Sequence, residues 1–205
     1  MKKTLIPKLI FSYVLFVVLG FIILCTFTQH AITHYAENRE AQQLYRESVQ
    51  IASGYADNYN KYSFSLQDFQ KQMQSLGEYL SAQIWIMDNQ GNILFDSTDE
   101  SVGKNAANAN YKTLKGFNTS DFGNRYYMTG NFYGSFSEKN LTVFSPITSN
   151  YRIHSYVMIH KTVSSITQNA NGFMNIVFYT IEFVFLTALF LLLLFAHGFT
   201  VHCTG

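Results

Sequence analysis

Two long apolar stretches constrain this chain more than any other feature of its sequence. Residues 9–27 read LIFSYVLFVVLGFIILCTF and contain no charged side chain, and residues 173–196 contain only Glu182. Each stretch is long enough to cross about 30 Å of hydrocarbon as an α-helix. The sequence therefore predicts two transmembrane helices, at residues 9–28 and 173–196, which bracket a single domain.

The flanking charges predict the orientation of these helices. An excess of basic residues marks the cytoplasmic side of a membrane protein, and three lysines precede the first stretch, Lys2, Lys3 and Lys8. The tail after the second stretch has no Lys or Arg, so the orientation depends on the N-terminal lysines alone. We expect a multi-pass cell-membrane protein made of cytoplasmic residues 1–8, an extracytoplasmic domain at 29–172 and a short cytoplasmic tail at 197–205.

Other interpretations of the apolar stretches are less favourable. A cleaved signal peptide would have an apolar core of about 7–15 residues followed by small residues, whereas the first stretch is longer and ends in TFTQH. Cys25 follows a bulky Leu24, which does not suit lipid attachment, and its thiol is expected to act as a small membrane-buried hydrophobe. Glu182 either couples to the helix of a second copy or lies near the outer interface, and the second is the simpler expectation.

The domain between the stretches has a balanced charge. It contains 11 Lys or Arg and 12 Asp or Glu, and the whole chain has a formal net charge of +1. A nucleic-acid-binding protein would normally carry a clustered basic surface, so we expect no nucleic-acid partner. The two cysteines, Cys25 and Cys203, both lie outside this domain, so it forms no internal disulfide.

The sequence has no motif that would identify an enzyme or a metal site. It lacks a Gly-rich phosphate loop, a nucleophile elbow, a His-Glu-x-x-His helix and a cysteine pair for zinc. His30 and His34 supply half of a metal site without a third ligand, and the acidic residues Asp96, Asp99 and Glu100 are more typical of a solvated loop than of a cation site. We therefore predict no catalytic residue, no cofactor and no metal in this chain.

The domain begins with two helical patterns. Apolar residues recur at steps of three, four and seven from Ala41 to Tyr59, and no Pro or Gly interrupts the chain between Gly20 and Gly54. The first span is therefore expected to run directly into this helix. A second helix is expected to follow a capping Ser65, and its core-facing stripe is Leu66, Phe69, Met73, Leu76 and Leu80.

After Ser81 the apolar period changes from 3.6 to 2, which indicates strands. Residues 83–88 and 93–97 are β-rich and are joined by the polar link NQGN, which is a strong hairpin signal. A long loop at 98–123, with one short helix near 111–115, is expected to follow. The remaining elements are strands at 125–133, 141–146 and 151–159, and a helix at 162–172 that leads into the second span.

These elements predict an α+β fold, with a mostly antiparallel five-stranded sheet and its helices gathered on one face. The last strand shows the clearest alternation of faces. One of its faces carries Ile153, Val157 and Ile159, and the other carries His154, Tyr156, Met158 and His160.

Two segments carry a resemblance to a known family. The hairpin IWIMDNQGNILFDS combines aliphatic and aromatic residues, an Asp, a Gly turn and a closing Asp-Ser, and the strand LTVFSPI ends in a Pro-Ile pair. Together with the order of the elements, this resembles the extracytoplasmic PAS-like (single Cache) sensor of bacterial sensor histidine kinases. Chemoreceptors and membrane diguanylate cyclases carry the same module.

The resemblance implies a homodimeric receptor, and it covers nearly the whole chain. The kinases of that family continue past the second span into a HAMP linker, a helix with the phosphoacceptor His and an ATP-binding domain. Here nine residues follow Ala196. The chain is thus expected to be a truncated or frameshifted product, a fragment, or a free-standing sensor.

For a PAS-like fold, the ligand site is expected on the sheet face away from the long helix, closed by the loop at 98–123. Arg125 there suits a bidentate pair with a ligand carboxylate. For each candidate, a role at the surface or at the edge of the core is the simpler alternative. The candidate lining residues are Arg125, Tyr127, Tyr133, His154, Tyr156 and Lys161.

The predicted function is a membrane receptor that detects an extracytoplasmic signal and transmits it across the membrane, as two-component sensor histidine kinases do. No catalysis is expected from this chain itself. The alternative is a membrane-anchored module that holds a partner protein through its outer domain and binds no small molecule.

Overall fold

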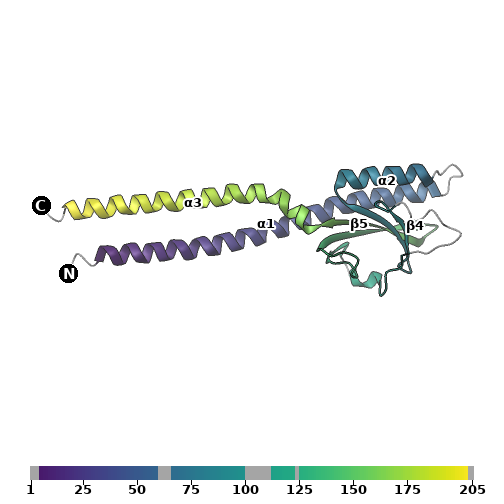
Figure 1. Ribbon diagram of the computed structural model, residues 1–205, viewed down its shortest axis with the longest axis horizontal. Coiled ribbons are helices and arrows are strands. Elements are labelled where there is room, and N and C mark those ends of the chain that lie inside the picture. Colours follow the sequence, from purple (N-terminus) through teal and green to yellow (C-terminus); the bar gives the residue numbers. More distant parts are fainter. Residues whose placement is uncertain (1–4, 60–65, 100–111, 123–124, 203–205) are drawn as a thin grey trace. The chain divides into compact units, whose positions relative to one another are not determined.

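The fold is α+β, as the sequence predicts. The computed structural model describes residues 5–59, 66–99, 112–122 and 125–202, and Figure 1 shows the order of the elements. The chain divides into two units, a compact domain at Ala36–Thr167 and a helical unit made of Met1–Tyr35 and Gln168–Gly205. All the strands belong to the compact domain.

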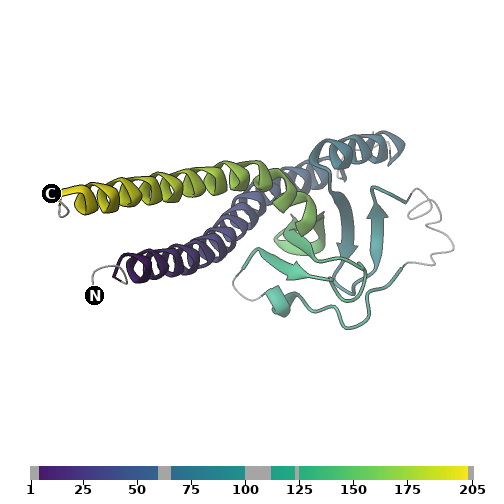
Figure 2. The same ribbon diagram turned by 60° about the vertical axis from the view of Figure 1, so that its left-hand side comes forward.

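Helix α1 (Leu5–Tyr59) is one helix of 55 residues, which confirms that the first apolar stretch runs into the first helix of the domain. Figure 2 shows its ribbon without a break. Pro7 lies in the first turn, where the missing N–H would have no intrahelical partner. Helix α3 (Val163–His202) has 40 residues and likewise joins the polar segment after the sheet to the second apolar stretch.

Both long helices contain a segment that is long and apolar enough to cross a membrane. The segments lie within Phe11–Ala56 and at Met174–Leu194, and the most apolar 18-residue window of each has a mean hydropathy of 2.4 and no buried residue. The side chains of these windows therefore face outward, unlike those of a core helix in a water-soluble protein. In the helical unit the two segments approach each other at Gly20, where an added Cβ would lie 3.7 Å from Cζ of Phe185.

Helix α2 (Leu66–Leu80) follows the predicted apolar stripe. Phe69, Met73 and Leu80 are buried and Leu76 is partly buried, and Asp68 lies in the first turn, where its charge complements the helix dipole. The expected capping residue, Ser65, lies outside the described residues. Figure 1 shows α2 beside the domain part of α1, and the edge-to-face rings of Tyr55 and Phe69, 5.3 Å apart, join the two helices.

The sheet has five antiparallel strands in the order β2-β1-β5-β4-β3. The longest strand, β5, lies at its centre and pairs with β1 along one edge and with β4 along the other. The strands are β1 (Gln83–Asp88), β2 (Ile93–Asp96), β3 (Tyr127–Gly130), β4 (Asn140–Ser149) and β5 (Arg152–Thr162).

The strands β4 and β5 extend beyond their predicted ends. A tight turn joins them, with φ of 51° at Asn150 and 60° at Tyr151, and such turns match the twist of an antiparallel hairpin. Pro146 lies in β4 beyond residues 140–143, which pair with β3, and among the described residues no strand pairs with β4 at Pro146 on the side away from β5, where a proline is tolerated.

The segment before β3 differs from the prediction. No helix forms at residues 112–115; instead Thr113 forms a bridge with Asn92, and the Leu114 N–H donates to the Gly91 carbonyl at 2.8 Å. These bonds bring Leu114 against the sheet, where it is buried. The short helix forms further on, as the 3-10 helix η2 (Thr119–Phe122). Residues 100–111 of the predicted loop lie outside the described residues.

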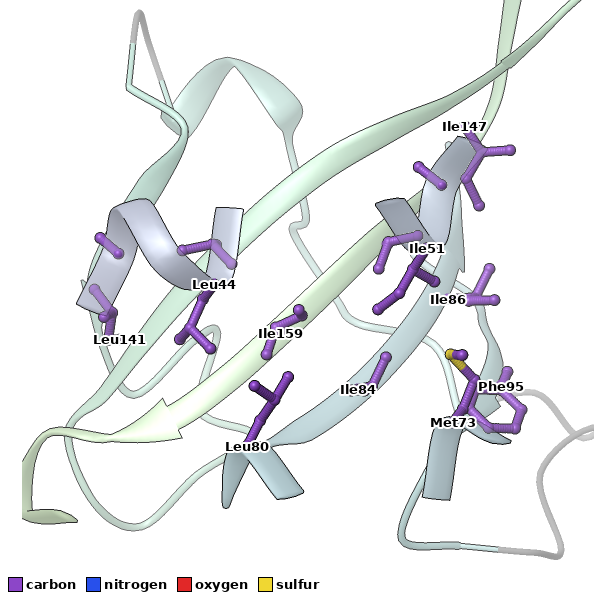
Figure 3. Packing of buried hydrophobic residues seen from close by; sticks show 14 of the residues in the cluster. Leu44, Ile51, Met73, Leu80, Ile84, Ile86, Phe95, Leu141, Ile147 and Ile159 are labelled. Atoms are coloured by element: carbon purple, nitrogen blue, oxygen red, sulfur yellow. The ribbon is translucent and has the colours of Figure 1, made fainter. Parts of the chain in front are cut away.

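The main core lies between the sheet and the two helices α1 and α2, and it is called the helix-side core below. Figure 3 shows Leu44 and Ile51 of α1 and Met73 of α2 among the side chains of the strands. The alternation predicted for β5 holds for Val157 and Ile159, which belong to this core, whereas Ile153 is 44% exposed. The buried members are Ala41, Leu44, Ile51, Ala52, Phe69, Met73, Leu80, Ile84, Ile86, Phe95, Leu141, Val143, Ile147, Val157, Ile159 and Ile166.

Gly91 and Gly116 differ in how closely neighbouring atoms approach them. Gly91 has φ of +85°, and a Cβ there would lie 3.0 Å from the Leu114 carbonyl oxygen and 3.1 Å from Phe117 Cβ, whereas Gly116 has φ of +78° and nothing within 4 Å. We expect Gly116→Ala to cost about 1 kcal/mol for its left-handed backbone alone, and Gly91→Ala to cost about 1–2 kcal/mol more. Denaturant unfolding measures both values, and equal losses would contradict the close approach.

Candidate functional site

A second buried cluster lies on the sheet face away from the helices. Figure 1 shows η2 on this side, opposite α2. The rings at its centre are named the aromatic box: Trp85 of β1, His160 of β5, and Phe132 and Phe136 of the segment between β3 and β4. The other buried members of the cluster are Met87, Ile93, Leu114, Tyr156 and Met158.

The rings of the aromatic box enclose His160. Its ring centroid lies 4.4 Å from that of Trp85, 4.8 Å from Phe132 and 4.9 Å from Phe136. Trp85 also stacks on Phe136, with an angle of 20° between the rings. Trp85 and Phe132 are 1% exposed and His160 is 2% exposed, so water is excluded from the centre of the box.

Strand register brings these groups together. In β1 and β5 side chains alternate between faces, so Trp85 and His160 point away from the helix-side core that Ile84 and Ile159 form. Thr142 of β4 stands directly opposite His160 in the ladder. Its Oγ1 lies 2.8 Å from Nδ1 of the imidazole.

Two nitrogen atoms of the box are buried without a hydrogen-bond partner among the described residues: Nε1 of Trp85 and Nε2 of His160. The indole nitrogen is a donor. If the Thr142 hydroxyl donates to Nδ1, the hydroxyl is satisfied and Nε2 carries a hydrogen; the other tautomer would leave the hydroxyl hydrogen unpaired as well. The first tautomer leaves fewer unpaired groups, so the box holds two unsatisfied N–H donors, each costing about 1–3 kcal/mol.

Burial lowers the pKa of His160 from 6.5 to about 3. The imidazole is therefore neutral at physiological pH, because desolvation penalises the charged form. A neutral imidazole is consistent with a single donor at Nε2 and with the bond between Nδ1 and the Thr142 hydroxyl.

The segment that covers the box has a strained backbone. Three consecutive residues adopt left-handed conformations: Phe132 with φ of 39°, Tyr133 with 53° and Gly134 with 74°. For residues other than glycine this conformation costs about 1–3 kcal/mol each. The turn is closed by the Ser135 and Phe136 N–H groups, which donate to the carbonyls of residues 132 and 131. The segment 131–136 is called the cover turn below.

Tyr133 links the cover turn to η2. Its hydroxyl donates to Asp121 Oδ2 at 2.6 Å, and its ring packs edge-to-face on Phe117. Partial burial and the bond to Asp121 raise the pKa of Tyr133. The hydroxyl therefore stays protonated and keeps donating over the physiological pH range.

On the helix side of the sheet, polar contacts join α1 to the strands. Lys161 Nζ of β5 donates to Glu40 Oε1 at 2.6 Å, with the two side chains only 11% and 22% exposed. The Tyr127 hydroxyl donates to Asn38 Oδ1 at 2.6 Å. The pair of Lys161 and Glu40 is called the polar clamp below. It ties α1 to the strand that leads into α3.

The six predicted lining residues do not share one site. Tyr133 and Tyr156 lie at the cluster on the expected face. Arg125 is exposed, and His154 is exposed with Nε2 3.2 Å from the Ser149 carbonyl oxygen.

The placement of Tyr127 and Lys161 on that face was wrong. Both bond to residues of α1 and so lie on the helix side. Lys161 follows His160, which points to the other face, and neighbouring residues of a strand alternate. Tyr127 lies on the helix side of the sheet because it pairs directly with Val143, a member of the helix-side core.

Sequence reasoning missed the aromatic box itself. The face assigned to His160 was right, and Trp85 alternates with Ile84 and Ile86 in a readable pattern. Those two signals were available in the sequence. Phe132 and Phe136 had none, because they sit in an irregular turn that the prediction assigned partly to a strand.

The acidic and histidine residues considered for metals show no site. Asp96 is buried and accepts hydrogen bonds from Gln83 Nε2 and from the Thr98 N–H and hydroxyl. Its carboxylate therefore stabilises the hairpin of β1 and β2. Over the part of the chain that the structure describes, no group of three or more His, Cys, Asp or Glu residues is placed to hold an ion. Glu100 lies outside those residues.

The polar clamp is expected to stabilise the domain more than the neighbouring ion pair does. Glu40→Gln and Lys161→Met each leave one largely buried charge without this ion pair. Each should cost about 1–3 kcal/mol, with a coupling energy of about 1–2 kcal/mol in the double-mutant cycle. Lys139 and Glu37 form a matched control, because they lie 3.7 Å apart with Lys139 60% exposed. Their coupling should stay below about 0.5 kcal/mol. Equal coupling energies would show that burial does not strengthen the clamp.

Comparison with known proteins identified no relative from which a function could be inferred. No protein-family model matches the chain, and no match to a curated protein was found.

Proposed function

We propose that the chain is a membrane-anchored sensor whose extracytoplasmic domain detects a signal at the aromatic box and passes it to the two apolar helices. One observation carries the proposal. His160 of the box and Lys161 of the clamp are consecutive residues of β5 on opposite faces, and two residues later the chain enters α3 at Val163. A displacement of β5 at the box therefore reaches both the clamp and the start of α3.

The fold supports this assignment to a PAS-like (single Cache) sensor. The sheet is five-stranded and antiparallel, helices cover one of its faces and a buried cluster lies on the other, as we expect of the domain that the chain resembles. The two helices that contain the candidate spans are also structural elements of the domain. Helix α1 contributes Leu44 and Ile51 to the helix-side core, and α3 contributes Ile166.

The mechanism requires two states that the signal binds with different affinity. In the first state the clamp holds β5 against α1. In the second, occupation of the box moves β5, which changes the bond between Lys161 and Glu40 and shifts α3 relative to α1. Small shifts between paired helices are an established way to transmit a conformational change, and in the family that the chain resembles a histidine kinase reads them.

The predicted topology can be tested in intact cells. In a background with Cys25→Ser and Cys203→Ser, we expect a membrane-impermeant thiol reagent to label Ser120→Cys, at an exposed position of η2. Lys8→Cys, also exposed, should react only after the membrane is permeabilised. Labelling of Lys8→Cys in intact cells would overturn the orientation, and recovery of the chain in the soluble fraction would overturn the membrane anchor.

Transmission can be tested with spin labels on the two apolar helices. Ile22 and Phe183 are 53% and 71% exposed and accept labels without disturbing the helical unit. In the full chain in lipid nanodiscs, Lys161→Met should change the distance distribution between the labels, whereas the control Lys139→Met should leave it unchanged. An unchanged distribution in Lys161→Met would refute transmission through the clamp and favour a membrane-anchored interaction module.

A further inference from the structure

We propose that the aromatic box binds a small apolar carboxylate, whose oxygens accept hydrogen bonds from Trp85 Nε1 and His160 Nε2, and that the cover turn opens to admit it. The inference rests on the proposed sensor function, since it names the ligand class of that site.

The unsatisfied atoms define the recognition chemistry. Both nitrogens are buried donors without a partner among the described residues, and the hydrogen bond of the imidazole to Thr142 uses Nδ1. A ligand group that only donates, such as an ammonium, cannot satisfy these two N–H groups. An acceptor oxygen satisfies both donors and removes the penalty that the closed box carries.

The surroundings require that the rest of the ligand is apolar. Methionine side chains on the sheet and aromatic rings of the cover line the region around His160. A polar ligand body would lose its hydration without compensation in this environment. Apolar and especially aromatic groups can replace the ring contacts that Phe132 and Phe136 now make with the imidazole.

The ligand enters the aromatic box when the cover turn opens. Phe132 and Phe136 both belong to it, and the left-handed φ angles of Phe132 and Tyr133 make its closed form a strained one. The turn lies between the ends of β3 and β4 and its residues join no strand. It can therefore move without breaking the ladder between β4 and β5.

A cation at the rim favours a carboxylate over a neutral carbonyl. Lys112 Nζ lies over the Trp85 ring, 5.7 Å from its centroid. Its ammonium group lies beside the indole that would donate to the ligand, so it adds an attraction for an anion that a neutral carbonyl does not feel. Lys112 itself is exposed, so it can turn towards an incoming carboxylate without being desolvated beforehand.

The chain contains a single tryptophan, Trp85, so one indole N–H resonance and one fluorescence spectrum report directly on the box. The test titrates the full chain in nanodiscs with three probes of similar size: benzoate, acetophenone and toluene. Benzoate should move the indole N–H resonance downfield with saturation, acetophenone should do so at higher concentration, and toluene should not. No saturable shift with benzoate up to about 10 mM would overturn the proposal.

Variants separate recognition from general packing. His160→Phe keeps a ring but removes the donor and should weaken benzoate binding about tenfold or more, whereas His154→Gln, on an exposed side chain, should not change it. Lys112→Met should weaken benzoate and leave acetophenone unchanged. If toluene binds as well as benzoate, or if His160→Phe binds benzoate as wild type does, the two donors do not recognise the ligand.

The outcome is distinguishable from failure of the sensor function. Saturable benzoate binding with no change in the spin-label distance between the apolar helices would leave the site standing and refute transmission. A clamp variant that changes that distance, together with no probe binding, would refute the ligand class and leave the sensor function standing.

Discussion

Acidification from about pH 7 to about pH 4 is expected to lower the free energy of unfolding by about 3 kcal/mol through His160 alone, given its pKa of about 3 in the folded domain. The cause is burial without a charged partner in the aromatic box. In the folded domain the imidazole is enclosed by Trp85, Phe132 and Phe136 and stays neutral.

The loss of stability at low pH follows from the lowered pKa of His160. Because the unfolded chain takes up a proton near pH 6.5 and the folded domain only near pH 3, protonation favours the unfolded state between these values. The contribution of His160 to stability is thus complete above about pH 6.5 and is lost progressively as the pH falls towards about 3.

The measurement is denaturant unfolding of the full chain in detergent at a series of pH values, followed by Trp85 fluorescence. Carboxyl groups also titrate below pH 5, so the informative quantity is the difference between wild type and His160→Phe at each pH. That difference should shift in favour of the variant as the pH falls. His154→Gln is the matched control, since His154 is exposed, and it should follow the wild type. Parallel curves for His160→Phe and wild type would show that the imidazole is not buried in neutral form.

Leu44→Ala is expected to destabilise the domain by about 3–4 kcal/mol. Leu44 is 0% exposed and belongs to the helix-side core, where Figure 3 shows it between α1 and the strands. Removing its methyl groups loses their transfer free energy and leaves a cavity that the surrounding structure closes only in part. The same side chain therefore holds α1 against the sheet beside the polar clamp.

A second residue of α1 provides the control. Val49 is 40% exposed, and Val49→Ala should change the free energy of unfolding by no more than about 0.5 kcal/mol. Both variants are compared by urea unfolding of the full chain. A loss below about 1 kcal/mol for Leu44→Ala would mean that α1 is not packed on the sheet as the structure has it.

Local patterns were sufficient to predict most of the elements. The uncharged stretches, the apolar stripe from Phe69 to Leu80 and the NQGN hairpin link each specify an element through neighbours close in sequence. The alternation in β5 also predicted that His160 and Val157 lie on opposite faces. These features depend on the period of a helix or strand, which a sequence displays directly.

The tertiary structure alone decided the composition of the candidate site. The position of β5 between β1 and β4 sets Thr142 opposite His160 and brings the Trp85 ring against the imidazole, and neither neighbour is close in sequence. The left-handed turn that places Phe132 over the box has no glycine or asparagine at its first two strained positions. Such a conformation is held by burial and ring contacts rather than by local preference, and those forces exist only after the sheet has formed.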